Sequence, residues 1–369
     1  MARTLPLVLT AVALGPRRTR RQRGVAVAGL LATWTTAYVG YRRAAKARTA
    51  TEWELLSLTS PEVFSRHYNE RVPTVEEELD TWGPYHRHRH HMRYGLVATM
   101  VREHLSPGDR ILDLGCGSAL LAGRLIDVDA AYVGMDFGGH HIDSAKRNSA
   151  GWRGRLRPSF ARGDAEGLPF ASNAFDLVVM SEVIEHFLRP DLAVWETARV
   201  LRPGGVLVVT TNNASEMPLR SPLSHLFVWL EKALGATHPH LISDRPWIWP
   251  DPIDRELLPE GSPPLFVPHT HHIQAETRRL LEAAGLQTLG WSTFEFPPPQ
   301  SATAAWLDAR EDGGIAIADR IEAVARRIPL VNRMGCHLSI VARKTGPEAA
   351  SRPPAGLWPG PFSLRPEAA

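Results

Sequence analysis

From Ile111 onward, short apolar runs alternate with glycine or acidic residues and with helical stretches, and this alternation constrains the fold most. Such runs predict buried parallel strands. They are Ile111–Leu114, Tyr132–Met135, Phe175–Met180, Val206–Thr210, Leu286–Phe296 and His337–Ala342. Helices are predicted between strands, at Asp191–Leu201 and at Gln274–Ala284, where Gly285 occupies the C-terminal cap position. Strands alternating with helices imply an α/β fold with a doubly wound sheet, which binds ligands at the carboxyl ends of its strands.

Charge is distributed unevenly along the chain. Ten of the 42 Lys and Arg residues lie in residues 1–50, which contain no Asp or Glu, so the remainder of the chain is acidic. An acidic body disfavours nucleic acid as a partner. The two cysteines, Cys116 and Cys336, exclude a disulfide scaffold and a cysteine-rich zinc module, and they favour a reducing, cytoplasmic location.

The two ends differ from the body, which we take as residues 51–345. The apolar run Leu5–Gly15 is too short to span a bilayer, and Val25–Tyr41 lies at the lower limit for a span. Residues 1–50 therefore admit three interpretations: an anchor at the inner face of the membrane or through it, a disordered basic arm, or a start codon assigned too far upstream. The proline-rich residues 346–369 predict a disordered tail.

A strand that runs into a tight glycine turn lies at 111–119. Gly115 and Gly117 allow the backbone to approach a ligand closely. The dinucleotide fingerprint is incomplete, because Leu120 stands where its third glycine belongs. Asp136 ends the next strand, where a carboxylate can bind both ribose hydroxyls, and Asp164 follows the third strand, within reach of an adenine.

Together these motifs resemble the class I S-adenosylmethionine-dependent methyltransferases, in particular the type 11 and ubiquinone-pathway O-methyltransferase branch. The resemblance runs from about Thr51 to Lys344. It implies a Rossmann-like seven-stranded sheet in the order 3-2-1-4-5-7-6, with strand 7 antiparallel and a helical insertion after strand 5. The implied cofactor-binding residues are Asp113, Gly115, Cys116, Gly117, Asp136, Phe137, Asp164, Ala165 and Ser181.

In that family the glycine loop holds the methionine part of S-adenosylmethionine, Asp136 binds the ribose, and Asp164 with Ala165 binds the adenine. This chain departs from the pattern at one position, because Ala119 replaces the third glycine of the loop. The extra methyl group is tolerable if Ala119 has ordinary helical backbone angles.

A metal site is one hypothesis for the segment after the fourth strand. Positions i, i+3 and i+4 of a helical turn share a face, so Glu182, Glu185 and His186 can converge. Two carboxylates and an imidazole suit Mg²⁺ or Mn²⁺, or Zn²⁺. His269 or His271 would supply a fourth ligand. Ubiquinone-pathway O-methyltransferases and small-RNA 2′-O-methyltransferases share this pattern. The alternative is that the two acids line a pocket or the surface and His186 packs, with no metal.

A second histidine-rich segment, Tyr85–His91, stands before the first helix predicted for the domain. Its alternating Arg and His residues are typical of a solvated surface, although His86 and His90 share a helix face and could bind zinc.

An insertion of about 60 residues, at roughly 212–268, separates strand five from the Gln274 helix and is far longer than an ordinary loop. Ser221 and Gly235 bound a predicted helix with one apolar stripe, which packs on its own domain or on a membrane surface. The aromatic stretch Trp247–Pro250 and Leu265–Phe266 predict an apolar wall for the acceptor.

The leading hypothesis is an O-methyltransferase for a small lipophilic acceptor resembling a quinone, an isoprenoid or a natural product. A hydroxyl acceptor must lose its proton, and His186, His271 or a metal ion could assist. Two alternatives are an RNA 2′-O-methyltransferase that uses the same metal site, and a membrane-associated protein that binds S-adenosylmethionine without turnover.

Overall fold

The computed structural model describes residues 61–70, 74, 82–213, 247–248, 251–253, 255–258, 260–261, 266–267, 270–272, 274–296, 306–329, 331–333, 335–346 and 352–353. All of them belong to one compact unit. The basic residues 1–50, the predicted helix between Ser221 and Gly235 and nearly all of the tail lie outside these residues. Among the helices that are described, none has the length and apolar character needed to cross a bilayer.

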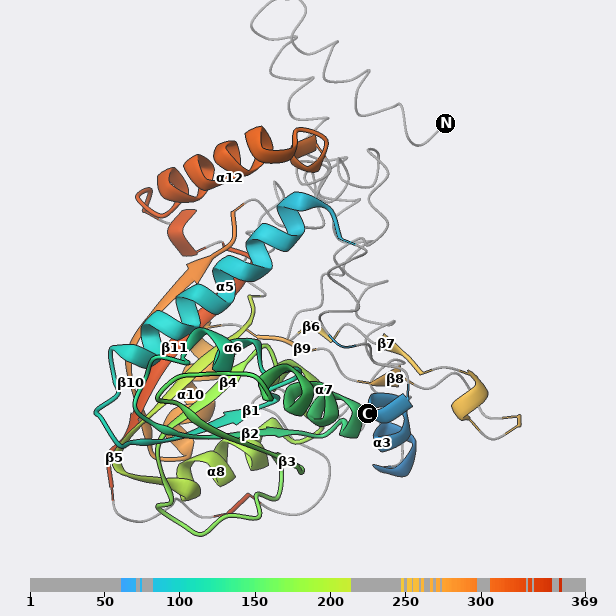
Figure 1. The fold of residues 1–369 in the computed structure, drawn as a ribbon, viewed down its shortest axis with the longest axis vertical. Helices are drawn as coiled ribbons and strands as arrows, with labels where there is room; N and C mark the ends of the chain where they lie inside the picture. The colour runs from blue at the N-terminus through green and yellow to red at the C-terminus, as the bar shows by residue number, and fades with distance from the viewer. Residues whose placement is uncertain are drawn as a thin grey trace, which may run out of the picture. The chain divides into compact units, whose positions relative to one another are not determined.

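Seven strands form the central sheet (Figure 1). Their order is β10 (Leu286–Phe294), β11 (His337–Lys344), β5 (Leu201–Asn212), β4 (Phe175–Ser181), β1 (Arg110–Leu114), β2 (Ala131–Asp136) and β3 (Arg157–Arg162). β11 runs antiparallel to both of its neighbours, and the other pairs are parallel. Numbered along the chain within this sheet, the order is 3-2-1-4-5-7-6. The predicted topology is therefore confirmed.

The apolar strands separate two hydrophobic cores. Because successive side chains of a strand point to opposite faces, Ile111 and Leu112 of β1 enter different clusters. Leu112 packs with residues of α8 (Pro190–Val200) and α10 (Gln274–Ala283). Ile111 packs with residues of α5 (Pro84–Arg102), α6 (Leu120–Arg124) and α7 (Gly139–Ser149). Helices on both faces explain why the central strands are mainly apolar instead of alternating regularly with polar residues.

Two segments differ from the sequence-based expectation. The fifth strand was expected at Val206–Thr210, after residues 202–205, but β5 begins at Leu201 and includes these residues. The pairing of β5 with β4 shifts in register between Phe175 and Leu177. Residues 202–205, which contain two glycines, therefore form an irregularity inside β5. The histidine-rich segment lies within α5 and not before it, because Pro84 opens the helix at its first turn. His86 stacks on Trp82 with ring centroids 4.3 Å apart, which is a packing role.

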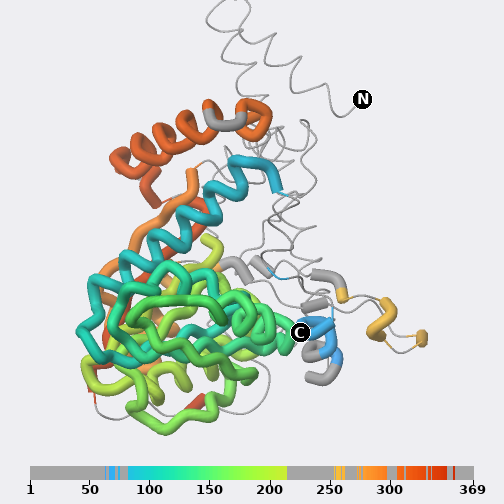
Figure 2. Tube along the Cα trace, in the orientation of Figure 1, coloured from blue at the N-terminus to red at the C-terminus, as the bar shows by residue number. Residues whose placement is uncertain are grey.

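α12 (Glu311–Ala325) lies beside α5, although the two helices are distant in sequence (Figure 2). Arg89 Nη2 of α5 donates to Glu322 Oε2 of α12 at 2.6 Å, and the Arg89 side chain is only 2% exposed. His88 Nε2 lies 3.1 Å from Asp319 Oδ1 on the same side of the helix pair. A buried ion pair thus joins α12 to α5.

The described parts around the predicted insertion form small elements. β6 (Trp247–Ile248) pairs with β9 (Thr270–His271), and β7 (Asp251–Pro252) pairs with β8 (Phe266–Val267). The 3-10 helix η2 (Arg255–Leu257) contacts α3 (Pro61–Glu70), where Arg66 Nη1 donates to the Leu257 carbonyl at 3.3 Å. Two further 3-10 helices are η1 (Ile184–His186) and η3 (Val331–Arg333).

Candidate functional site

The glycine loop follows β1 and has left-handed backbone at both glycines. Gly115 has φ +69° and Gly117 has φ +50°. A Cβ on Gly115 would lie 2.5 Å from Val183 Cγ2, whereas a Cβ on Gly117 would meet nothing within 4 Å. The amides of Gly115 and Cys116 both donate to the Met135 carbonyl, at 2.8 and 3.1 Å. The loop is therefore held against β2 and packed under the segment that follows β4.

Ala119, the departure from the family pattern, also has left-handed backbone, with φ +71° and ψ +31°. Ala119 therefore does not have the ordinary helical backbone angles that would make its methyl group tolerable without strain. For an L-residue this conformation costs roughly 1–2 kcal/mol. The strain lies at the N-terminal cap of α6, directly after the loop.

Asp136 ends β2 with its carboxylate fixed by three neighbours. Oδ2 accepts from the Gly117 amide at 2.9 Å, and Oδ1 accepts from the Gly138 amide at 2.8 Å. His141 Nδ1 lies 3.1 Å from Oδ1. The bond from Gly117 connects the glycine loop directly to the predicted ribose-binding acid. His141 was not identified from the sequence, although its position in the first turn of the helix after β2 places it near that acid.

Asp113 lies beneath the loop and is 3% exposed. Its Oδ2 accepts a hydrogen bond from the Tyr132 hydroxyl. Burial raises the pKa of Asp113 to about 7, against the opposing effect of the Tyr132 hydrogen bond. This predicted cofactor-binding residue is thus a buried support of the loop, and its pKa of about 7 leaves part of it protonated near neutral pH.

We expect Asp113→Asn to change how stability depends on pH. The folded state retains the Asp113 proton up to about pH 7, whereas the ordinary pKa of an Asp in an unfolded chain is 3.8. Between pH 3.8 and about pH 7, ionisation of Asp113 lowers the free energy of unfolding as the pH rises. The decrease is at most about 1.4 kcal/mol per pH unit. The stability of the variant relative to the wild type should therefore increase from pH 4 to pH 7 in urea titrations. Parallel pH profiles for the two proteins would contradict this assignment.

The remaining predicted cofactor residues lie at the carboxyl ends of β2, β3 and β4. Asp164 Oδ1 accepts from the Glu166 amide at 2.8 Å, and Ala165 is buried. Ser181 Oγ lies 3.1 Å from Thr210 Oγ1. Cys116 is buried between the two glycines, and burial raises the pKa of its thiol.

α3 covers this edge of the sheet, a role that the sequence did not indicate. The Tyr68 ring packs edge-on against Phe137, which follows β2, and against His186, which follows β4. The distances between ring centroids are 6.3 Å and 6.1 Å. Asn69 Oδ1 accepts from the Gly139 amide at 2.8 Å. Tyr68 therefore touches both the predicted cofactor side and the predicted acceptor side. A helix far upstream of the motifs offers no local signal for this position.

The segment after β4 does not form the predicted ligand face. Glu182 has left-handed backbone, with φ +55°, and precedes η1 instead of lying in it. Glu185 accepts from Thr211 Oγ1 at 2.9 Å, and His186 lies against Tyr68. Within the described part of the chain, Glu182, Glu185 and His186 do not form a group with ligand atoms within 4.8 Å of one another. The expected convergence fails because the left-handed turn at Glu182 breaks the helical spacing.

The structure describes less of His269 and His271, the other two histidines of the metal hypothesis. His269 lies outside the described residues. The backbone of His271 pairs with Trp247 between β9 and β6, and its side chain is not described.

A buried charge cluster, composed of Glu182, Glu295, His337 and Arg93, lies at the same edge of the sheet. Glu182 Oε2 is 3.0 Å from His337 Nε2 and 3.5 Å from Arg93 Nη1, and Glu295 Oε2 is 2.9 Å from His337 Nδ1. Burial alone would raise the pKa of both carboxylic acids, but His337 and Arg93 hold both pKa values at about 2. Burial also acts against a protonated imidazole, yet the two carboxylates raise the pKa of His337 well above its ordinary value.

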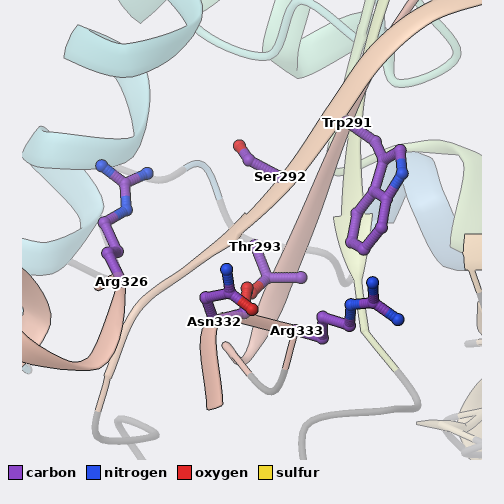
Figure 3. Close-up of a pocket in the computed structure, with 6 residues that line it drawn as sticks. All are labelled: Trp291, Ser292, Thr293, Arg326, Asn332 and Arg333. Atoms are coloured by element: carbon purple, nitrogen blue, oxygen red, sulfur yellow. The ribbon is translucent and has the colours of Figure 1, made fainter. Parts of the chain in front are cut away.

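A separate cavity of about 400 Å³ lies beside β10 (Figure 3). Two of its lining residues are arginines, and Arg333 lies 5.8 Å from the Trp291 ring. The lining residues are Trp291, Ser292, Thr293, Arg326, Asn332 and Arg333. None of the predicted site residues lines this cavity.

Comparisons with known proteins find similarity over the part of the chain that contains the glycine loop and Asp136. Residues 112–209 match the family model described as methyltransferase domain. The chain is 37% identical over 106 residues to a ubiquinone biosynthesis O-methyltransferase of Mesorhizobium japonicum, and 35% identical over 106 residues to that of Sinorhizobium medicae. Each match spans 29% of this chain and 42% of the relative, so the chain covers less than half the length of these relatives.

A solved S-adenosylmethionine-dependent methyltransferase structure from Methanosarcina mazei aligns at 18% identity with a TM-score of 0.44, covering 66% of this chain and 96% of that one. The strand order and the glycine loop define the class of the domain: a Rossmann-like fold of the methyltransferase type. Residues 112–209 therefore carry a methyltransferase domain, on a seven-stranded sheet in the order 3-2-1-4-5-7-6.

Proposed function

We propose that this protein transfers a methyl group from S-adenosylmethionine to an oxygen atom of a small lipophilic acceptor. The observation that carries the proposal is the bond from the Gly117 amide to Asp136, which fixes loop and acid together at the carboxyl ends of β1 and β2. That position is where doubly wound sheets bind ligands.

The residues present suit the cofactor of this class. Gly115 and Gly117 have left-handed backbone and carry no Cβ atom. A ligand can therefore approach the loop closely at these two positions. The Asp136 carboxylate accepts one amide hydrogen bond on each oxygen and retains lone pairs for ribose hydroxyls. Phe137 and Tyr68 supply aromatic surface beside this acid.

When bound, S-adenosylmethionine supplies a methyl group on a sulfonium that is already activated. The task of the protein is then to align the acceptor oxygen with that methyl group and to exclude water. Tyr68, which contacts both Phe137 and His186, is suited to cover the site.

Transfer to oxygen is favoured by the similarity to relatives that are ubiquinone biosynthesis O-methyltransferases. We assign removal of the acceptor proton to His186, which follows β4 at the acceptor side, with His271 as the alternative. Mg²⁺ or Mn²⁺ at Glu182, Glu185, His186 and His269 has less support, because Glu182 is already paired with His337 and Arg93.

We expect Asp136→Ala to weaken S-adenosylmethionine binding by roughly 1.5–3 kcal/mol, since the loss removes charge-assisted hydrogen bonds to the ribose. Isothermal calorimetry measures the affinity, and transfer of a labelled methyl group to candidate quinols and phenols tests the reaction. Asp143→Ala, an exposed acid on α7, is the matched control and should leave affinity unchanged. Because Asp136 also holds the loop, thermal melting should show that the variant is folded. Absence of heat with the wild type, or equal affinity in Asp136→Ala, would reject the assignment.

A further inference from the structure

Three side chains of different chemistry come together where the chain leaves β10 and where it enters β11. Phe294 and His337 are paired across the two strands, and the Cys336 amide donates to the Glu295 carbonyl at 3.2 Å. Glu295 has φ +65°, and this left-handed residue interrupts the alternation that would direct its side chain away from His337. The ligand atoms of Glu295, Cys336 and His337 all lie within 4.8 Å of one another, and all three residues are buried.

We propose that Glu295, Cys336 and His337 bind one Zn²⁺ ion. Carboxylate oxygen, thiolate sulfur and imidazole nitrogen are the three ligand types that zinc uses in proteins. The sulfur ligand argues against Mg²⁺ and Ca²⁺, which prefer oxygen. Three protein ligands leave a fourth position, which a water molecule occupies in zinc sites of this kind.

The surroundings of His337 support coordination through Nδ1. This atom lies 2.9 Å from Glu295 Oε2, but the two atoms do not have hydrogen-bond geometry, as expected of two ligands that converge on a third point. The other ring nitrogen, Nε2, lies 3.0 Å from Glu182 Oε2. A carboxylate on the far nitrogen is the usual partner of a metal-bound histidine, because it fixes the tautomer and orients the ring.

Binding of Zn²⁺ requires the thiolate form of Cys336 and a free lone pair on Nδ1 of His337, so any proton on these atoms leaves as the ion enters. The Glu295 carboxylate and the thiolate then offset the charge of the ion, and Arg93 remains 3.5 Å from Glu182.

Protons compete with zinc at this site, so affinity increases with pH. Apart from the ligands themselves, the titratable and charged groups that act on the cluster are Glu182 after β4 and five residues of α5, namely Tyr85, His86, Arg89, His90 and Arg93.

The test uses the full chain, loaded with Zn²⁺ or Co²⁺ and then freed of excess metal on a desalting column. We expect one Zn²⁺ per chain by elemental analysis, and a sulfur-to-cobalt charge-transfer band in the Co²⁺ form. Cys336→Ser should abolish that band, whereas Cys116→Ser, which alters the other buried cysteine, should retain it. The band excludes binding by the surface histidines, since only a thiolate produces it.

A second variant keeps the proposal testable if Cys336→Ser does not fold. Glu182→Gln retains all three ligands but loses the charge on the outer partner of His337, and it should weaken zinc affinity about 10–100-fold. Circular dichroism and thermal melting establish that each protein is folded. A wild-type chain that binds no zinc, a cobalt band that persists in Cys336→Ser, or unchanged affinity in Glu182→Gln would each overturn the site. None of these measurements depends on methyl transfer, so their failure is distinct from failure of the proposed function.

Discussion

Glu322→Ala is expected to lower the free energy of unfolding by about 3–5 kcal/mol, because it leaves a buried charge without its partner. Arg89 Nη2 donates to Glu322 Oε2 at 2.6 Å, and the arginine side chain is 2% exposed. The same carboxylate oxygen accepts from the Phe296 amide at 2.7 Å, so the substitution also leaves a buried N–H without an acceptor.

Urea denaturation followed by circular dichroism measures this loss. The double variant Arg89→Met with Glu322→Leu should recover much of it, since an apolar pair of similar volume removes the uncompensated charge. The control is Glu282→Ala, which breaks the exposed pair Arg278–Glu282 at 3.2 Å and should cost about 0.2–0.5 kcal/mol. A loss for Glu322→Ala as small as that of the control would show that the α5–α12 pair does not stabilise the fold.

Gly115→Ala is the second large effect, with an expected loss of about 2–5 kcal/mol in unfolding free energy. The left-handed backbone accounts for roughly 1–2 kcal/mol of that loss. The rest, roughly 1–3 kcal/mol, comes from overpacking, because the new Cβ would lie 2.5 Å from Val183 Cγ2 and 2.9 Å from its Cβ. Val183 is β-branched and stiff at χ1, so it cannot move aside easily.

Gly117→Ala separates the two causes. Gly117 is also left-handed, but a Cβ there meets nothing within 4 Å, so only the backbone cost of roughly 1–2 kcal/mol is expected. Adding Val183→Ala to Gly115→Ala should produce a favourable coupling of about 1–3 kcal/mol in a double-mutant cycle. If Gly115→Ala cost no more than Gly117→Ala, the close approach of Val183 would not be a constraint on the loop.

Most of the fold could be predicted because its signals are local. The run Ile111–Leu114 is apolar because it is buried on both faces, and β1 occupies Arg110–Leu114. The glycine pair and Asp136 were identified because a tight turn after one strand and an acid at the end of the next are each visible in a few adjacent residues. The structure joins them directly, through the Gly117 amide.

Local spacing failed where one backbone angle departed from the assumed helix. The i, i+3, i+4 argument for Glu182, Glu185 and His186 requires all three to be helical, and the left-handed φ of Glu182 removes the first of them. Ala119 shows the same limit, since its sequence position suits a helix start but its φ is +71°. A positive φ in a non-glycine residue is imposed by tertiary contacts, and nothing in the neighbouring residues indicates it.

By itself, therefore, the sequence determined the doubly wound sheet, the glycine loop and the position of Asp136 at the end of a strand, since periodicity and short motifs encode them within single elements. Tertiary structure alone decided which charges face one another. Arg93, Glu182 and His337 come from a helix before β1, the end of β4 and the start of β11, and only the antiparallel insertion of β11 beside β5 brings them within 3.5 Å of a partner. Ion pairs between distant elements depend on how the sheet is ordered, and no local pattern in the chain records that order.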